Sequence, residues 1–458
     1  MKPARLLIVD DNIRCVGGHY FELVTSLATA AHRFGYEVHV AAHQQFSDFD
    51  AVPGGVQLSP IFRARRMVRW SMGVDGASVL PRGLSGRYRG PVHRTMRHSI
   101  ADARTFRCKR PMVMMRRWRE DLSGWLGQMQ VRSSDQILVT TSDDFGLLAL
   151  AGVLAKIPTP LSIAAIVHFA LVDRGTEDAT TKLKTIGDQI RRAMFAAGVK
   201  LPIGPTSARH QLRLFATTEG LTRQYTAAGT GLSVTPIDYP TRAAKVNHSS
   251  HRSNGRSTAC PVRCGLAGYP RAEKGRESIG ELLDRMTPSL RSGQTSVTLQ
   301  APADQWSDLI PKSATDLAAC DDADAAISVL TGVLSTADYH RWIGGFDIGV
   351  FLYDPSRYEV RCSGILLELM VRGVPVIVPD RCHLADQVRR HGGQGRAGYI
   401  FRDRSEVPGL IDQFCRHGES MIRHCRETAA IVAGQHRAEV ALRTMGFGPG
   451  KVAVQKAA

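Results

Sequence analysis

Short apolar runs alternate with segments of helical periodicity along most of the chain. Residues 6–9 are four consecutive apolar positions, which is typical of a strand buried in a parallel sheet. From His19 onward, apolar residues recur every three or four positions as far as Phe34, and Gly35 follows. This pattern predicts a helix that ends at a glycine, and residues 38–42 then supply a second strand. The first forty residues therefore predict a β-loop-α-β unit.

The same alternation continues through the rest of the chain. Further strands are predicted at residues 137–140, 161–167, 214–217, 262–266, 295–300, 325–330, 348–352 and 374–378. Residues 238–259 are polar, basic and without periodicity, which is typical of a linker. The pattern predicts two doubly wound α/β domains, residues 1–235 and 261–435, joined by a linker at 236–260.

Composition narrows the class of protein. The chain has 458 residues, of which 43% are hydrophobic and 22% charged, so disorder throughout is excluded. No apolar run approaches the ~18 residues of a membrane-spanning helix, and the first apolar run is too short for a signal peptide. Nine cysteines are widely scattered without a CxxC, which favours reduced thiols. We expect a cytoplasmic protein.

The net charge of +17 is concentrated in one segment. Residues 63–119 contain sixteen Arg or Lys against two acids, which gives +14. Such a segment is expected to meet an anionic partner; because no nucleic-acid-binding motif is present, we expect a membrane surface, with the protein peripheral on its cytoplasmic face. A helical apolar stripe follows, formed by Met115, Trp118, Leu122, Trp125 and Met129. The alternative is that this stripe packs on the domain core.

The most informative stretch for chemistry is residues 351–380, which predicts strand, loop, helix and strand. Ser363 suits a helix N-cap, and Gly364 lets a ligand approach backbone amides that can bind phosphate. Glu368 lies inside the helix, where its carboxylate could accept hydrogen bonds from two ribose hydroxyls. The alternative is a surface pair between Glu368 and Arg372 at spacing i,i+4.

A second stretch, residues 268–275, follows the predicted strand at 262–266 and reads GYPRAEKG. Arg271 and Lys274 could stabilise the negative charge of a departing diphosphate. The alternative is a solvated turn that carries a cluster of charges. Taken alone, the short motif favours that turn, but its place before the 351–380 stretch favours ligand binding.

Together these stretches resemble the retaining, nucleotide-sugar-dependent glycosyltransferases of the GT-B fold (glycosyl transferases group 1, family four). The matching residues are Leu352-Tyr353, Ser363-Gly364, Glu368, Gly373-Val374-Pro375-Val376 and Lys274 of an R-x-x-x-E-K-G loop. Two positions depart from the pattern. Val360 stands where the family has its first glutamate, and Tyr269 stands where it has an arginine, for which Arg271 is the candidate substitute.

The resemblance implies two doubly wound Rossmann-like domains that face across a cleft, with residues 436–458 crossing back to the first domain. It implies a hexosyltransferase-like enzyme that transfers sugar from a nucleotide-sugar donor with retention, without a metal or other cofactor. The acceptor is open, with a lipid-linked sugar and a polysaccharide as candidates. The alternative function is a non-catalytic GT-B-like protein that binds a membrane or nucleic acid through residues 63–119.

The resemblance also assigns roles. Lys274, Arg271 and His168 are the candidate catalytic residues; His168 follows the apolar run 163–167, at the expected carboxyl end of a strand. Gly17, Gly18, Ser363, Gly364 and Glu368 are the candidate donor-binding residues. A Gly-Gly pair is otherwise a tight turn, and a lone histidine is otherwise structural.

No metal site is expected. The pairs Asp10-Asp11 and Asp143-Asp144 are interpreted as solvated acids.

Overall fold

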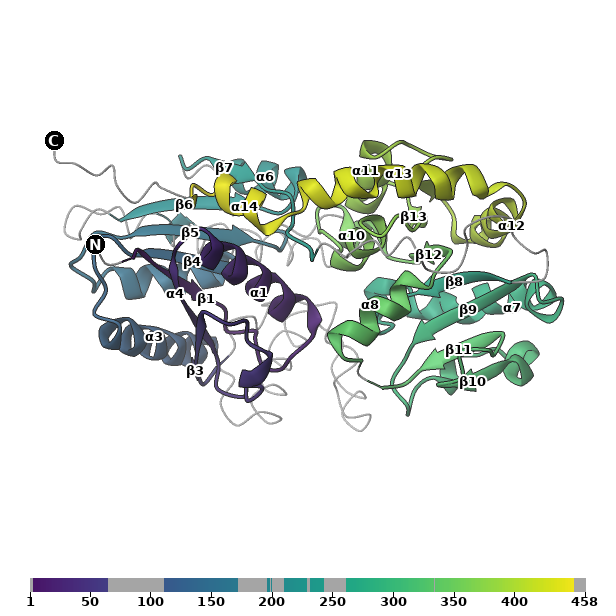
Figure 1. Ribbon diagram of the computed structural model, residues 1–458, viewed down its shortest axis with the longest axis horizontal. Coiled ribbons are helices and arrows are strands. Elements are labelled where there is room, and N and C mark those ends of the chain that lie inside the picture. The colour runs from purple at the N-terminus through teal and green to yellow at the C-terminus, as the bar shows by residue number, and fades with distance from the viewer. Residues whose placement is uncertain are drawn as a thin grey trace, which may run out of the picture. The chain divides into compact units, whose positions relative to one another are not determined.

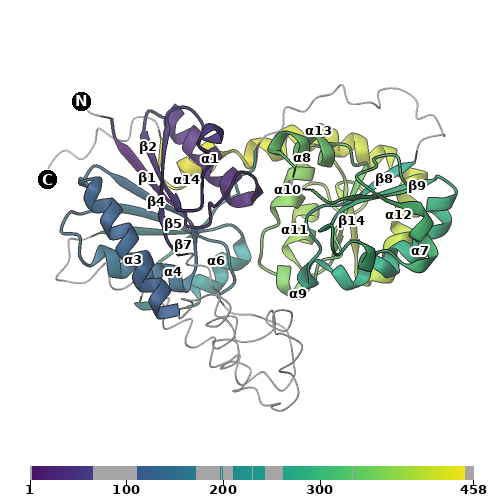
Figure 2. The ribbon, with the colours of Figure 1, turned by 90° about the horizontal axis from the view of Figure 1, so that it is seen from below.

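The computed structural model describes residues 3–64, 111–171, 196–197, 199, 210–228, 231–242, 261–332 and 334–448. These residues form two compact units (Figures 1 and 2). One unit contains the described residues of Met1–Ile237 and Leu442–Ala458, and the other contains those of Asp238–Ala441. The basic segment at 63–119 lies outside the described residues between positions 65 and 110.

The first unit is built on a parallel seven-stranded sheet in the order β3-β2-β1-β4-β5-β6-β7. Its strands are β1 (Arg5–Val9), β2 (Glu37–His43), β3 (Val56–Phe62), β4 (Gln136–Ser142), β5 (Ser162–Val167), β6 (Gln211–Ala216) and β7 (Val234–Pro236). Its helices are α1 (Gly18–Arg33), α3 (Pro111–Gln128), α4 (Asp144–Leu154) and α6 (Glu219–Thr226), and α14 (Ala438–Thr444) enters it at Leu442.

The second unit is built on another parallel seven-stranded sheet, in the order β10-β11-β9-β8-β12-β13-β14. Its strands are β8 (Val262–Leu266), β9 (Thr295–Gln300), β10 (Ala318–Cys320), β11 (Ile327–Leu330), β12 (Ile348–Val350), β13 (Val376–Pro379) and β14 (Gly398–Phe401). Its helices are α7 (Ile279–Arg291), α8 (Thr336–Gly344), α9 (Pro355–Tyr358), α10 (Gly364–Met370), α11 (His383–Arg390), α12 (Val407–His417) and α13 (Glu419–Gln435).

Side chains that alternate along the strands of the second sheet pack into two hydrophobic cores, one on each face of the sheet. On one face, Ile377 packs in a cluster with residues of α7 and α12. On the other face, its neighbours Val376 and Val378 pack with residues of α8, α10 and α11. Figure 2 shows these helices on opposite sides of the sheet. Because both faces are covered, central strands such as β12 and β13 are apolar along their length, and the sequence shows them as continuous apolar runs.

The predicted apolar stripe after the basic segment packs on the core of the first unit. It lies on α3, where Trp118 is fully buried and stacks on Phe62 of β3 with 5.5 Å between ring centroids. Met115, Leu122 and Trp125 are also buried. The core alternative is therefore the correct interpretation of the stripe.

Residues Leu442–Phe447 pack within the first unit. The Arg213 guanidinium lies 5.5 Å from the ring centroid of the buried Phe447, and that of Arg443 lies 5.6 Å from the ring centroid of Phe34. The seven cysteines of the described residues are free thiols. No helix among the described residues is long and apolar enough to cross a membrane.

Candidate functional site

A pocket lies where the strand order of the second sheet reverses. The chain leaves β8 toward β9 on one side and later returns to β12 on the other, so the loops after β8 and β12 diverge at their carboxyl ends. Ligands of doubly wound sheets bind at such a point. The pocket is lined by Leu266, Ala267, Gly268, Pro270, Lys274, Ile279, Leu299, Gln300, Val350, Leu352 and Tyr353. The two motif stretches of the sequence thus meet in one place.

Lys274 supplies the positive charge of this pocket. It ends a short 3-10 turn, Ala272–Lys274, after which Gly275 adopts φ 77°. A side chain at Gly275 is excluded, since a Cβ there would stand 2.1 Å from the carbonyl oxygen of Leu352. Lys274 Nζ lies 5.6 Å from the Tyr353 ring centroid and makes no hydrogen bond or ion pair with the described residues. This loop therefore places in the pocket an ammonium group that is available to bind a ligand.

Burial changes the protonation of Lys274. Desolvation, assisted by the charge of Arg271, lowers the pKa of the Lys274 ammonium to about 8, while Glu273 and Glu368 oppose the change. The side chain therefore remains mostly charged at neutral pH. Lys274 is half-buried, and partial desolvation of a cation without a hydrogen-bonded counter-ion is costly, so an anionic ligand would relieve that cost.

Two further pocket residues were not assigned roles from the sequence. The Tyr353 hydroxyl is buried close to Ser363, and burial raises the pKa of Tyr353 well above its usual value. The Tyr353 hydroxyl is therefore a neutral donor. Gly268, at φ 84°, packs so closely on Lys274 and Ile365 that a Cβ would stand 2.7 Å from Nζ and 2.6 Å from Ile365 Cδ1.

The start of α10 contains Ser363 and Gly364. The Ser363 hydroxyl accepts a hydrogen bond from the Leu366 amide at 3.3 Å, which confirms the predicted N-cap. Ser363 is buried, and Gly364 is half-buried with Tyr239 at 3.9 Å from the position of a Cβ. Because Gly364 has no side chain, a ligand can approach the backbone amides at the start of α10.

Glu368 lies on the same helix and is half-buried. Its Oε2 accepts a hydrogen bond from the Tyr339 hydroxyl at 2.9 Å. Arg372 Nη1 donates to the main-chain oxygen of Glu368 at 2.5 Å, and burial lowers the pKa of the Arg372 guanidinium. The alternative of an exposed i,i+4 surface pair does not describe this geometry, because both side chains are half-buried and the Arg372 hydrogen bond is to the backbone. No pattern in the sequence indicated a role for Tyr339.

Arg271 lies at the rim of the same loop. Its side chain is 67% exposed and pairs with Glu273 at 3.8 Å. The structure thus brings Lys274, Arg271, Ser363, Gly364 and Glu368 into one unit, with Lys274 in the pocket and the Arg271 side chain directed to solvent.

Gly17, Gly18 and His168 belong to the other unit. Gly17 and Gly18 have φ 84° and 74° immediately before α1, a conformation that favours glycine. His168 follows β5, and its Nε2 donates to the Thr140 carbonyl oxygen at 2.7 Å, which places a proton on Nε2. Burial lowers the pKa of His168, so the ring is neutral.

The interpretation of the aspartate pairs as solvated acids is wrong. Asp10, Asp11, Asp143 and Asp144 are all buried. Asp10 Oδ2 accepts hydrogen bonds from the hydroxyls of Thr140 and Thr141, both at 2.7 Å.

The first aspartate of each pair also accepts hydrogen bonds from residues close to it in the chain. Asp10 Oδ1 accepts two bonds from Asn12, both at 2.9 Å, and Asp143 caps α4 by accepting from the Gly146 amide. The hydrogen bonds from β4 to Asp10, which follows β1, thus replace those that its carboxylate would make with water.

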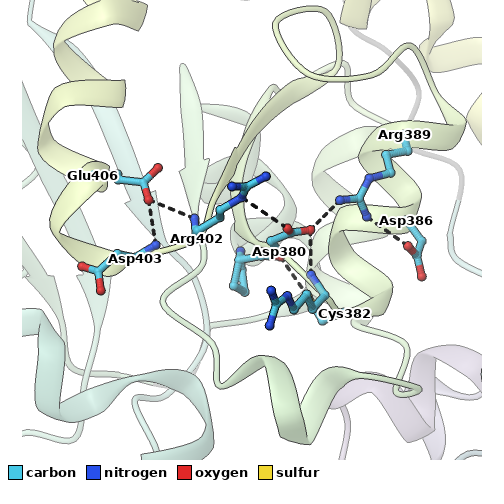
Figure 3. Close-up of polar contacts among 9 residues, drawn as sticks. Asp380, Cys382, Asp386, Arg389, Arg402, Asp403 and Glu406 are labelled. Carbon is cyan, nitrogen blue, oxygen red and sulfur yellow. Dashed lines mark hydrogen bonds and ion pairs between the residues drawn. The ribbon is translucent and has the colours of Figure 1, made fainter.

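Charged side chains also order the loop after β13 (Figure 3). Asp380 accepts from the Arg381 amide at 2.8 Å and pairs with Arg389 of α11 and with Arg402. Arg381 has φ 56°, which is uncommon for a residue with a side chain, and the Asp380 contacts hold the turn. A capping box between Asp403 and Glu406 lies next to it. This cluster stabilises the turn into α11.

The described residues contain no group of three or more His, Cys, Asp or Glu side chains arranged to hold a metal ion. Neither a protein-family model nor a curated protein sequence matches the chain.

Solved structures do resemble this one. Sucrose-phosphate synthase from Thermosynechococcus elongatus has a TM-score of 0.60 and 10% identity over 97% of this chain and 98% of its own. A UDP-forming trehalose-phosphate synthase from Burkholderia vietnamiensis has a TM-score of 0.59 and 12% identity over 97% and 99%. WaaG, a glycosyltransferase involved in lipopolysaccharide biosynthesis, has a TM-score of 0.55 and 12% identity over 97% and 100%.

The chain has the GT-B fold. This confirms the predicted fold class of two doubly wound parallel sheets. In this GT-B chain, the described pocket lies in the second unit, at the strand reversal between β8 and β12.

Proposed function

We propose that the protein is a glycosyltransferase that transfers a hexosyl unit from a nucleotide sugar with retention of configuration. The observation that carries the proposal is the pocket at the strand reversal of the second sheet, with Lys274 as its half-buried cation. A nucleoside diphosphate is the ligand class that such a site fits, because its phosphates need fixed positive charge and its sugar and ribose need hydrogen-bond partners.

In this proposal, the diphosphate lies between Lys274 and the start of α10. Lys274 binds it inside the pocket, and the Ser363-Gly364 amides bind it at the helix start. Arg271 reaches it from the rim of the loop. These groups would stabilise the negative charge that develops as the sugar leaves the diphosphate, so that the reaction needs no metal ion or other cofactor.

The remaining candidate residues contact the nucleoside and the sugar. Glu368 accepts hydrogen bonds from the ribose hydroxyls. Gly17, Gly18 and His168 of the first unit contact the donor sugar or the acceptor, with the neutral His168 ring held in place by its Nε2–H bond to the Thr140 carbonyl oxygen.

The neighbours' own activities agree with this chemistry. One of them forms UDP, and a trehalose-6-phosphate synthase among them catalyses glycosyl transfer with retention.

The direct test is nucleotide binding by the full chain. UDP, GDP and ADP are each titrated by calorimetry in the presence of a chelator. We expect one of them to bind without added metal, and at 100 times its dissociation constant to stabilise the fold by about 2.7 kcal/mol.

Matched variants locate the site. Lys274→Ala should weaken binding by roughly tenfold or more, since a charge-assisted hydrogen bond contributes about 1.5–3 kcal/mol. Lys312→Ala, at an exposed lysine of the same unit, should leave it unchanged. If no nucleotide binds, or if binding requires added magnesium or manganese, the proposed site chemistry is wrong. Of these two outcomes, the absence of all nucleotide binding would also favour the non-catalytic alternative.

For the acceptor, we propose a lipid-linked sugar at a membrane surface. The support is the +14 charge of residues 63–119, and one neighbour, WaaG, is involved in lipopolysaccharide biosynthesis. Two described arginines of this segment are engaged within their own unit. Arg63 pairs with Asp121 at 2.7 Å, and Arg119 donates to the carbonyl oxygens of Leu148 and Ala149.

Vesicle sedimentation tests the membrane surface. The chain should bind vesicles that contain phosphatidylglycerol in preference to neutral phosphatidylcholine vesicles, and it should dissociate as salt is raised. Equal partitioning to both kinds of vesicle would contradict a membrane role.

A further inference from the structure

Tyr339 on α8 and Glu368 on α10 are joined across the second unit by a hydrogen bond. The Tyr339 hydroxyl donates to Glu368 Oε2, with 2.9 Å between the oxygens. The two residues are 29 positions apart, on helices that cover the same face of the sheet. The bond therefore depends on the tertiary fold and is not a local contact.

The donor is fixed in its protonated state. Burial, the nearby Glu368 charge and the hydrogen bond itself raise the pKa of Tyr339 well above 10. Tyr339 is therefore protonated at neutral pH and donates its hydroxyl proton to the Glu368 carboxylate.

Neighbouring contacts fix the positions of both side chains. The Tyr339 ring lies 6.1 Å from that of Trp342, whose Nε1 donates to Thr298 Oγ1 at 3.0 Å. On the other side, Arg372 holds the main chain of Glu368 through its carbonyl oxygen. The Tyr339 bond thus orients the carboxylate, and the Arg372 bond holds the backbone from which the side chain extends.

We propose that Tyr339 is a positioning residue for nucleoside recognition: it orients the Glu368 carboxylate toward the ribose hydroxyls of the donor. A carboxylate offers about four lone-pair sites, and the bond from Tyr339 uses one of them. This proposal rests on the proposed function, in which Glu368 binds ribose. The competing explanation is that the bond only ties α8 to α10.

Ribose chemistry separates the two explanations. UDP, GDP, ADP and the 2′,3′-dideoxy form of each are titrated into the full chain, and the ratio of the two affinities is measured for the nucleotide that binds. The wild type should prefer the ribonucleotide by roughly tenfold, since one charge-assisted hydrogen bond contributes about 1.5 kcal/mol or more. Tyr339→Phe should bring this ratio close to one, with dideoxynucleotide affinity changed less than about twofold.

Two further variants complete the design. Glu368→Gln should also reduce the ratio, and the double variant should reduce it no further, because both changes act through one carboxylate. Tyr399→Phe is the control, since Tyr399 is a buried tyrosine of the opposite core cluster. It should keep the wild-type ratio.

The results that overturn the proposal are distinct from failure of the proposed function. If Tyr339→Phe weakens ribo- and dideoxynucleotides equally, or keeps the wild-type ratio, then Tyr339 only ties the helices together. If the wild type binds nucleotide through Lys274 but does not distinguish ribose from dideoxyribose, the ribose role of Glu368 is wrong. If no nucleotide binds at all, the proposed function fails together with this inference.

Discussion

Gly268 and Lys274 pack against each other in the pocket of the second unit: a Cβ at Gly268 would stand 2.7 Å from Lys274 Nζ. The two residues lie on one loop between β8 and α7, and Gly268 has φ 84°. The glycine therefore serves two purposes: it permits the backbone conformation and leaves room for the ammonium group.

Gly268→Ala should weaken nucleotide binding by roughly tenfold, because the new methyl group displaces the ends of Lys274 and Ile365. Gly293→Ala is the matched control. Gly293 has φ 69°, but nothing lies within 4 Å of its Cβ position. Both variants should lose about 1 kcal/mol of unfolding free energy to backbone strain. Equal nucleotide affinities in the two variants, measured by calorimetry, would show that the close packing has no role in binding.

Nucleotide binding should depend on the protonation of Lys274. Its pKa of about 8 means that the ammonium loses its proton as the pH rises from 7 to 9. The dissociation constant of the diphosphate should therefore rise by roughly tenfold over this range. In Lys274→Met, binding should be weak and should not vary with pH.

Lys274→Met should also leave the unliganded fold as stable as the wild type or more stable, because it removes a buried charge. This can be checked by urea denaturation. A strong decrease in unfolding free energy would mean that Lys274 is part of the core rather than a ligand-binding group.

The sequence predicted the buried strands well and the edge strands poorly. Strand β5, predicted at residues 161–167, lies at Ser162–Val167, because this buried central strand is apolar from Ile163 to Val167. Strand β3 was missed. It is at the edge of its sheet, contains Gln57, Ser59 and Pro60, and therefore shows no apolar run.

The site was predictable only where its residues are neighbours in the chain. The loop with Lys274 and the helix start with Ser363 are short motifs that the chain shows directly. Contacts between residues that are far apart in the sequence could not be recognised in this way. Tyr339 and Glu368 are 29 positions apart, and Asp10 and Thr140 are 130 apart. For that reason no role could be predicted for Tyr339, and Asp10 was expected to be solvated.

Asp10 should be important for the stability of the first unit. Its carboxylate accepts from Thr140, Thr141 and Asn12, and all four residues are buried. Asp10→Ala would remove the buried acceptor of these bonds and should cost roughly 2–4 kcal/mol of unfolding free energy. Asp50→Ala, at an exposed position of the same unit, should change it by less than about 0.5 kcal/mol. Urea denaturation measures both. A small loss in Asp10→Ala would mean that water replaces the carboxylate at this site.

Three histidines of the second unit should make stability fall at mildly acidic pH. Burial and neighbouring positive charges lower the pKa values of His340, His383 and His391 to about 4, from the usual 6.5. The unfolded chain takes up protons at these groups as the pH falls below 6.5, whereas the folded chain does so only near 4. Since the unfolded state binds more protons in this window, unfolding free energy should decrease from pH 6.5 to 4.

His391 offers the clearest measurement of this effect. Its Nε2 is buried without a hydrogen-bond partner among the described residues, and Arg390 and His436 oppose its protonation while Asp238 favours it. His391→Gln should be less stable or equal at pH 7, yet should lose less unfolding free energy than the wild type between pH 6.5 and 4.5. His417→Gln, at an exposed histidine of α12, should keep the wild-type profile. Urea denaturation at half-unit pH steps measures the three slopes. Parallel profiles for wild type and His391→Gln would show that His391 takes up its proton equally in the folded and unfolded chains.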